Sequence, residues 1–344
     1  MNASTKRVLA ALRNETTDCT PVISVCQHAT YDVMERVNAP WPQAHGDPEM
    51  MAALSGAGAE ILGLDAVRVP YCQTVEAEAL GAVIKSGGAL HLPSIAEHPF
   101  KIGDDPEFPR DFLQLGRIPV VLRAVELIKK RFDGSAAVMA GLCGPFSIAA
   151  SLLGITVLLK TAYKKPEAIT PFLELGLKCG SALAEAYRQA GADVIVIEDM
   201  MASLDMISPK MYREIVAGYE TRLEEAVKLP SIIHICGKLD GIIADVARTG
   251  ANAVSVESSV NIPAARETLA GYGLCTSIAG AVHPMEVLLE GTPEDVTSAV
   301  ESSIEDGAAL ISPGCAVAPG TPTENLIAMV EAGHRYRLRF TETK

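Results

Sequence analysis

Eight short aliphatic runs, separated by helical segments, are the feature of this chain that most restricts its fold. Short turns such as residues 190–192 and 249–251 lead from a helix into the next run. This alternation predicts parallel strands joined by right-handed crossovers, and eight such strands indicate a closed (β/α)8 barrel of the TIM type. The predicted strands are residues 22–27, 66–69, 137–140, 193–199, 231–236, 253–257, 275–280 and 308–315.

The competing α/β architecture is an open, doubly wound sheet. No Gly-x-Gly-x-x-Gly follows any predicted strand, which disfavours a dinucleotide-binding fold. Hydrophobic residues make up 49% of the chain but aromatic residues only 5%, so the core is built from small aliphatic side chains, as in a parallel sheet covered on both faces. We therefore predict one barrel domain over residues 1–344.

Two segments depart from the regular alternation. Residues 5–14 predict a helix that precedes the first strand, as an N-terminal extension. Residues 77–92 alternate weakly around Gly87-Gly88, which predicts a hairpin-like insertion after the second strand. Further along, Thr292 and Thr321 each precede a proline and resemble helix caps.

Net charge and cysteine usage exclude several classes of protein. The net charge of −13 makes nucleic acid or an anionic membrane surface a poor partner. Eight cysteines in 344 residues have neither the density nor the clustering of a disulfide framework. The N-terminus lacks an apolar signal core, and no apolar run approaches the ~18 residues needed to span a bilayer. We expect a reduced, cytoplasmic protein.

Three distant side chains predict a metal centre. His234 and Cys236 share one face of a strand, because side chains alternate along extended backbone. Cys315 ends the last predicted strand. In a barrel, residues at the carboxyl ends of different strands meet around one mouth. One imidazole and two thiols equal the three protein ligands of a catalytic zinc site, which keeps its fourth position open.

The other six cysteines are assigned to the core, where a buried cysteine behaves as a small apolar side chain, although Cys26 and Cys143 also lie close to strand ends. Glu257 ends the strand after the His-Cys strand and is a candidate fourth ligand in the absence of substrate. The alternative is a solvated or paired carboxylate at the barrel mouth. Asp199 is a candidate proton acceptor or partner of a ligand N–H, with a local cap of the following loop as the alternative.

The charge of this ligand set indicates a reaction type. Zinc bound by two thiolates and a neutral imidazole has no formal net charge, so it generates hydroxide weakly. It still favours the thiolate form of a substrate thiol, whose pKa is about 8.5 when free. The sulfur ligands leave that thiolate nucleophilic. Alkylation of a thiolate therefore fits the site better than hydrolysis.

The chain resembles the methylcobamide:coenzyme M methyltransferases, within the wider uroporphyrinogen decarboxylase fold family. The resemblance covers nearly the whole chain, and its specific part is His234-x-Cys236 with the distant Cys315, which matches the zinc ligands of that family. Five further stretches are also similar to it: residues 39–45, 66–72, 116–121, 255–257 and 313–319.

The resemblance implies a specific activity and specific partners. Zinc held by His234, Cys236 and Cys315, with Glu257 in the resting site, would bind coenzyme M as a thiolate. Methylcobalamin on a separate corrinoid protein would donate the methyl group over the barrel mouth. Tetrahydrofolate or another thiol as acceptor, and a metal-binding accessory protein without turnover, remain alternatives. A uroporphyrinogen decarboxylase is disfavoured, because residues 26–30 hold no arginine where that branch needs several.

Overall fold

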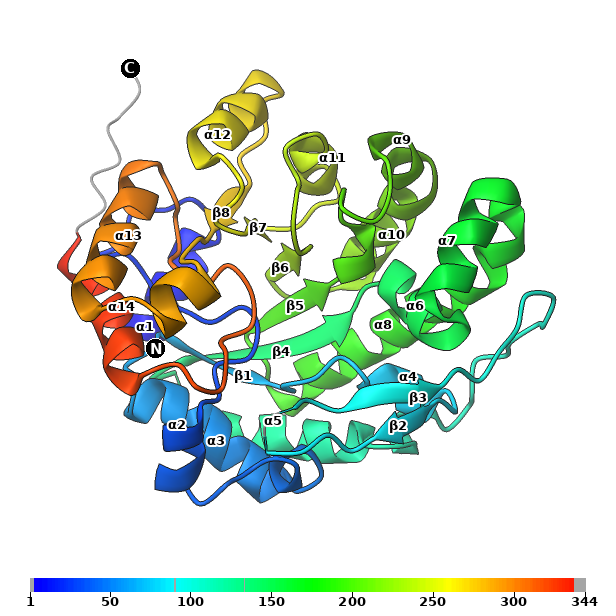
Figure 1. Ribbon diagram of the computed structural model, residues 1–344, viewed down its shortest axis with the longest axis horizontal. Coiled ribbons are helices and arrows are strands. Elements are labelled where there is room, and N and C mark those ends of the chain that lie inside the picture. The colour runs from blue at the N-terminus through cyan, green and yellow to red at the C-terminus, as the bar shows by residue number, and fades with distance from the viewer. Residues whose placement is uncertain (1–2, 90, 133, 337–344) are drawn as a thin grey trace.

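The computed structural model describes residues 3–89, 91–132 and 134–336. Six parallel strands form one sheet in the order β1-β4-β5-β6-β7-β8, and helices surround it (Figure 1). The strong aliphatic character of these segments accounts for their burial on both faces. The strands are β1 Ala66–Val69, β4 Ala137–Cys143, β5 Val194–Glu198, β6 Ser231–His234, β7 Ala253–Ser255 and β8 Ser277–Ala279.

The two other predicted strands, 22–27 and 308–315, are irregular. They contact their neighbours through isolated parallel bridges instead of continuous ladders, and the Asp65 amide at the start of β1 donates to the Val22 carbonyl at 2.8 Å. Side chains replace part of the ladder, since the Val25 amide donates to the Ser312 hydroxyl at 3.2 Å. The two segments thus lie between β8 and β1, and the predicted (β/α)8 class is confirmed. The bridges are Val22 with Ile311, Ala279 with Leu310, and Val282 with Pro313.

The helices follow the predicted alternation, with differences at their ends. Helix α13 begins at the predicted cap Thr292, which forms a capping box with Asp295. The predicted cap of the last helix, Thr321, is wrong, because α14 begins after Pro322 without a side-chain cap. The hydroxyl of Thr323, the first residue of α14, donates to the Asp32 carboxylate. The helices are α1 Ala3–Ala11, α2 Tyr31–Arg36, α3 Pro48–Glu60, α4 Val75–Ala79, α5 Ile118–Phe132, α6 Pro145–Leu153, α7 Ile155–Lys164, α8 Thr170–Ala190, α9 Pro209–Met211, α10 Ala217–Ala226, α11 Ile243–Ala247, α12 Ile262–Gly271, α13 Pro293–Glu305 and α14 Thr323–Arg335.

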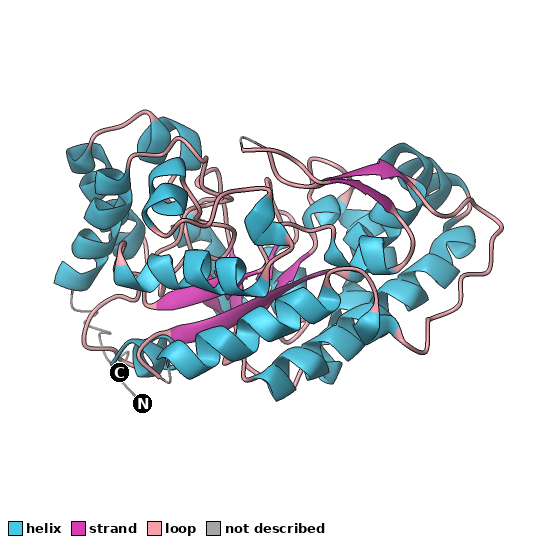
Figure 2. Ribbon diagram, turned by 90° about the horizontal axis from the view of Figure 1, so that it is seen from below, coloured by secondary structure: helices cyan, strands magenta, loops and turns pink. Residues whose placement is uncertain are grey.

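The predicted insertion after the second strand is present as a hairpin of β2 Val83–Lys85 and β3 Ser94–Glu97. It lies later in the chain than the predicted residues 77–92, because Val75–Ala79 forms the short helix α4. Figure 2 shows this hairpin standing apart from the main sheet. Within the described residues no single helix is long and apolar enough to cross a bilayer. Helices α6 and α7 meet that criterion only as a pair, bent by 112° at their junction.

Helix α1 closes the amino end of the barrel. The Val8 side chain of this helix and the Leu12 side chain just after it pack with inward residues of the strands, among them Met139 and Val196, in one buried cluster. The Ser277 hydroxyl also donates to the Ala11 carbonyl at 2.7 Å. With this end filled largely by apolar side chains, Glu198 and His234 lie at the opposite, carboxyl ends of their strands.

Candidate metal centre

Register places four side chains in one row at the carboxyl ends of neighbouring strands. Cys143 of β4 pairs with Glu198 of β5, which pairs with His234 of β6, which pairs with Ser255 of β7. Residues aligned in a parallel sheet point to the same side. All four are buried. The imidazole of His234 is therefore carried by a rigid strand with defined neighbours on both sides.

The structure brings the three predicted metal ligands together. His234 Nε2 lies 3.2 Å from Cys236 Sγ, and Cys236 Sγ lies 3.7 Å from Cys315 Sγ. A ring nitrogen of His234 and Cys315 Sγ are within 4.8 Å of each other. Zinc bound tetrahedrally at about 2.3 Å to two sulfurs separates them by about 3.8 Å. The spacing of the two sulfurs therefore fits ligands of one metal ion.

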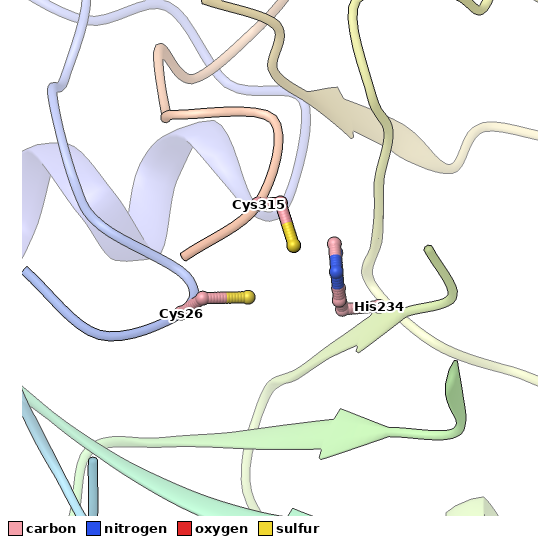
Figure 3. Close-up of side chains that lie close together, drawn as sticks. All are labelled: Cys26, His234 and Cys315. Carbon is pink, nitrogen blue, oxygen red and sulfur yellow. The ribbon is translucent and has the colours of Figure 1, made fainter. Parts of the chain in front are cut away.

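Cys26, assigned to the core on sequence, belongs to the same cluster. Its Sγ, Cys315 Sγ and a ring nitrogen of His234 all lie within 4.8 Å of one another, and Figure 3 shows the three side chains converging from separate segments. The only sequence signal was its position near the end of the first predicted strand. The contact depends on the irregular segments 22–27 and 308–315 lying side by side, which periodicity does not predict.

Glu257 lies on the other side of Cys315. One of its carboxylate oxygens is within 4.8 Å of both Cys236 Sγ and Cys315 Sγ. These three side chains are half-buried, whereas Cys26 and His234 are buried. The candidate centre therefore has an inner side at Cys26 and a more accessible side at Glu257.

Asp199 is buried and points toward a helix rather than toward the described donor groups. Its carboxylate accepts hydrogen bonds from the Ser147 amide and hydroxyl, both at 2.7 Å, and from the Phe146 amide at 3.2 Å. It thus caps the N-terminus of α6. The contacts resemble the capping alternative, although the capped element is α6 and not the loop after β5.

Among the cysteines of the cluster, Cys315 is the one whose thiolate form is favoured. Hydrogen bonding with Cys236 and Cys26 lowers the pKa of Cys315 far below its ordinary value. The hydrogen bond with Cys315, together with burial, raises the pKa of Cys236 and of Cys26. Cys315 is the residue shared by both donor groups.

Comparison with known proteins identifies the family. Residues 3–336 match the uroporphyrinogen decarboxylase (URO-D) family. The chain belongs to the URO-D family. It is 34% identical over 331 residues to methylcobamide:CoM methyltransferase MtaA of Methanosarcina barkeri, covering 96% of this chain and 97% of that protein. It is 32% identical to methylcobamide:CoM methyltransferase MtbA of Methanosarcina acetivorans, covering 96% and 98%.

A solved structure described as a methyltransferase from Methanosarcina mazei superimposes with a TM-score of 0.93 at 35% identity, covering 97% of this chain and 99% of that one. The predicted resemblance within the URO-D family is confirmed, and so is the prediction of an enzyme of the methyltransferase type. A B12-independent methionine synthase from Shewanella sp. W3-18-1, at 14% identity and a TM-score of 0.57, shares the fold alone.

Ser255 orients the imidazole in this URO-D family member. Its hydroxyl lies 3.0 Å from His234 Nδ1, which leaves Nε2 directed toward Cys236. Loss of a residue that hydrogen-bonds a metal-binding histidine lowers metal affinity by about 10- to 100-fold. We expect Ser255→Ala to weaken zinc binding by this factor, measured by competition with a chromophoric chelator. Ser298→Ala, on exposed α13, should leave the affinity unchanged, and an equal loss in both variants would contradict the assignment.

Burial makes the Asp199 carboxyl a source of pH-dependent stability. Burial, the largest cause, raises its pKa to about 6, although hydrogen bonds from Ser147 and Phe146 oppose the shift. A raised carboxyl pKa contributes stability below the unfolded-state pKa of about 4, and that stability is lost as pH rises through 6.

Asp199→Asn removes this titration and keeps an acceptor for α6. From pH 4 to pH 7 we expect the variant to gain up to about 3 kcal/mol of unfolding free energy relative to wild type, measured in urea. If the variant instead lost unfolding free energy relative to wild type between pH 4 and pH 7, the prediction would be contradicted.

Proposed function

We propose that this chain transfers a methyl group from a methylated corrinoid to the thiol of coenzyme M, at a zinc ion held by His234, Cys236 and Cys315. The observation that carries the proposal is the convergence of these donors at 3.2 and 3.7 Å from segments 79 residues apart. The names of the related methylcobamide:CoM methyltransferases support the reaction and the acceptor.

The donor set fits zinc. Two sulfurs and one imidazole are common zinc ligands, and three protein ligands leave a position for substrate. Bound there, zinc would favour the thiolate form of the acceptor without quenching its nucleophilicity. Its site lies at the open, carboxyl end of the barrel, since α1 fills the other end. A separate corrinoid protein would therefore dock over the strand ends.

The remaining side chains have supporting parts in this proposal. Ser255 holds the His234 ring in position through its hydroxyl at 3.0 Å. Glu257, within reach of Cys236 and Cys315 on the more accessible side, is placed to hold the fourth position or to meet the incoming thiol. A direct catalytic part for Asp199 has less support, because its carboxylate is engaged by Ser147 and Phe146.

Two alternatives make different predictions. Methyl transfer to tetrahydrofolate or another thiol keeps the donor and changes the acceptor, while uroporphyrinogen decarboxylation needs no zinc. The acceptors are compared by mixing the protein with free methylcobalamin and either coenzyme M, tetrahydrofolate or 2-mercaptoethanol. The rate of methyl transfer is measured as the loss of methylcobalamin absorbance. We expect transfer to coenzyme M to be fastest. Faster transfer to tetrahydrofolate would overturn the choice of acceptor.

A further inference from the structure

The segment of residues 134–166 carries no acidic side chain, although the chain has 42 acidic residues in all. Its charged side chains are Lys160, Lys164 and Lys165, so the segment has a charge of +3 in a chain of net charge −13. All three lysines are exposed, and none of them forms an ion pair with a residue that the structure describes. These cations are therefore available to a charged partner.

The exposed side of α7 combines these lysines with apolar side chains. Val157, Lys160, Tyr163 and Lys164 follow one another at intervals that place them on one side of a helix. Val157 is 42% exposed and Tyr163 is 80% exposed, whereas the opposite side of α7 is buried in the core. We call these four residues, with Lys165, the α7 face. Exposed apolar side chains with a polar rim mark surfaces that bind other molecules, so the α7 face has the composition of a docking surface.

Helix α7 lies at the edge of the barrel mouth. Helix α6 begins directly after the carboxyl end of β4, α7 follows it, and α8 then leads back to the start of β5. Figure 1 shows α6 and α7 beside the β2–β3 hairpin, on the side toward which β4 points. The segment after the hairpin is bonded to α6, since His98 Nδ1 lies 2.8 Å from the Ser151 carbonyl oxygen. The Phe100 amide also donates to the Leu152 carbonyl at 3.3 Å, so α6 and α7 are held beside the mouth.

A cavity of about 210 Å³ lies between α7 and the strand ends. Ile155, the first residue of α7, lines this cavity together with Gln73 and with Cys143 at the end of β4. Cys143 belongs to the strand-end row that holds His234. The Gln73 side-chain amide donates to Glu198 of that row at 3.0 Å. A protein bound on the α7 face is therefore next to the row of side chains that holds the candidate centre.

We propose that the α7 face docks the protein that carries the methyl donor, by contact with an acidic surface of that protein. The inference rests on the proposed function, which requires a separate corrinoid protein at the barrel mouth. Because this chain has a net charge of −13, most of its surface repels an acidic partner, and the α7 face attracts one. The three lysines thus set the orientation of the partner as well as the rate of its association.

An anionic membrane is the competing partner for a helix face rich in lysine. A helix that lies in the membrane interface presents a continuous apolar face to the lipid. Helix α7 buries its apolar side in the core of the protein, and Val157 and Tyr163 are the large apolar side chains that it exposes. An acidic protein surface therefore fits the α7 face better than lipid does.

The test compares a protein-bound methyl donor with a free one. Lys160→Glu with Lys164→Glu reverses the charge of the α7 face without changing a buried side chain. With a methylated corrinoid protein from the same organism, we expect kcat/KM to fall at least about 10-fold at low salt. With free methylcobalamin and coenzyme M, the rate should equal that of the wild type. The matched control, Lys130→Glu with Lys178→Glu, makes the same change of net charge at exposed positions of α5 and α8.

Salt gives a second measurement that needs no variant. Between about 0.1 M and about 1 M salt, where screening removes attraction between exposed charges, kcat/KM of the wild type for the corrinoid protein should fall toward that of the charge-reversed variant. The rate with free methylcobalamin should not follow this dependence. A wild-type kcat/KM for the corrinoid protein that is independent of salt would overturn the proposal.

The outcomes separate this inference from the proposed function. If the charge-reversed variant matches the wild type with the corrinoid protein, or if the control loses as much, the inference fails and the proposed function stands. The inference also fails if the variant keeps its rate with the corrinoid protein but no longer binds vesicles of phosphatidylserine and phosphatidylcholine that the wild type binds, because the α7 face then serves a membrane. If the wild type does not demethylate free methylcobalamin with coenzyme M, the proposed function itself fails.

Discussion

Replacing Cys315 with alanine is expected to remove most of the bound zinc and most of the methyl transfer. Cys315 is the corner shared by both donor groups, and its sulfur lies 3.7 Å from Cys236 Sγ. Loss of a residue that only hydrogen-bonds a metal ligand already lowers metal affinity or activity by about 10- to 100-fold. If Cys315 is a direct zinc ligand, as proposed, its removal should exceed that, with a loss of at least about 10³-fold in kcat/KM for coenzyme M.

The matched control is Cys143→Ala. Cys143 is also buried at a strand end, but its sulfur is outside the described donor groups. Zinc per chain and the rate of methylcobalamin demethylation should be near the wild-type values in this control. Retention of bound zinc and more than a tenth of the activity in Cys315→Ala would show that Cys315 is not a ligand.

Replacing Arg68 with methionine is expected to destabilise the fold by about 3–5 kcal/mol, the usual cost of breaking a buried ion pair from one side. The Arg68 guanidinium bonds the Glu198 carboxylate inside the barrel, and their side chains are 3% and 2% exposed. Without arginine, only the Gln73 side-chain amide, at 3.0 Å, remains as a described donor to that carboxylate. Urea unfolding of the metal-free protein gives the free energy without a contribution from zinc.

Two further variants make the ion-pair prediction specific. Removing both charges, in Arg68→Met with Glu198→Leu, should recover most of the loss, because no charge then stays buried alone. Arg222→Ala breaks a pair with Glu174 whose side chains are 49% and 36% exposed, and should cost at most about 1 kcal/mol. A double variant as unstable as Arg68→Met alone would contradict the electrostatic explanation.

Periodicity predicted most of the barrel but not its closure. Six strands lie where aliphatic runs predicted them, since a strand buried on both faces needs a continuous apolar run. Segments 22–27 and 308–315 are equally apolar, yet they pair through isolated bridges because side chains such as Ser312 take part of the backbone bonding. The helical region between β4 and β5 is also divided, at Gly154 and at Lys165.

The same limit explains what was found and missed at the centre. His234 and Cys236 share a strand, and Cys315 follows a Ser-Pro-Gly turn at another strand end, so local pattern and the family resemblance identified all three. Their meeting in space agrees with that prediction, and their part as zinc ligands remains the proposal. Cys26 was missed because its place depends on which irregular segments become neighbours. The contact of Asp199 with α6 could not be predicted from local pattern, because that helix begins 54 residues earlier in the chain.

The most direct test of the central claim is a zinc titration of metal-stripped protein, followed by the rate of methyl transfer from methylcobalamin to coenzyme M. The proposal predicts negligible transfer without metal and a rate that rises in proportion to bound zinc until each chain holds one ion. Full transfer by the zinc-free protein would contradict it.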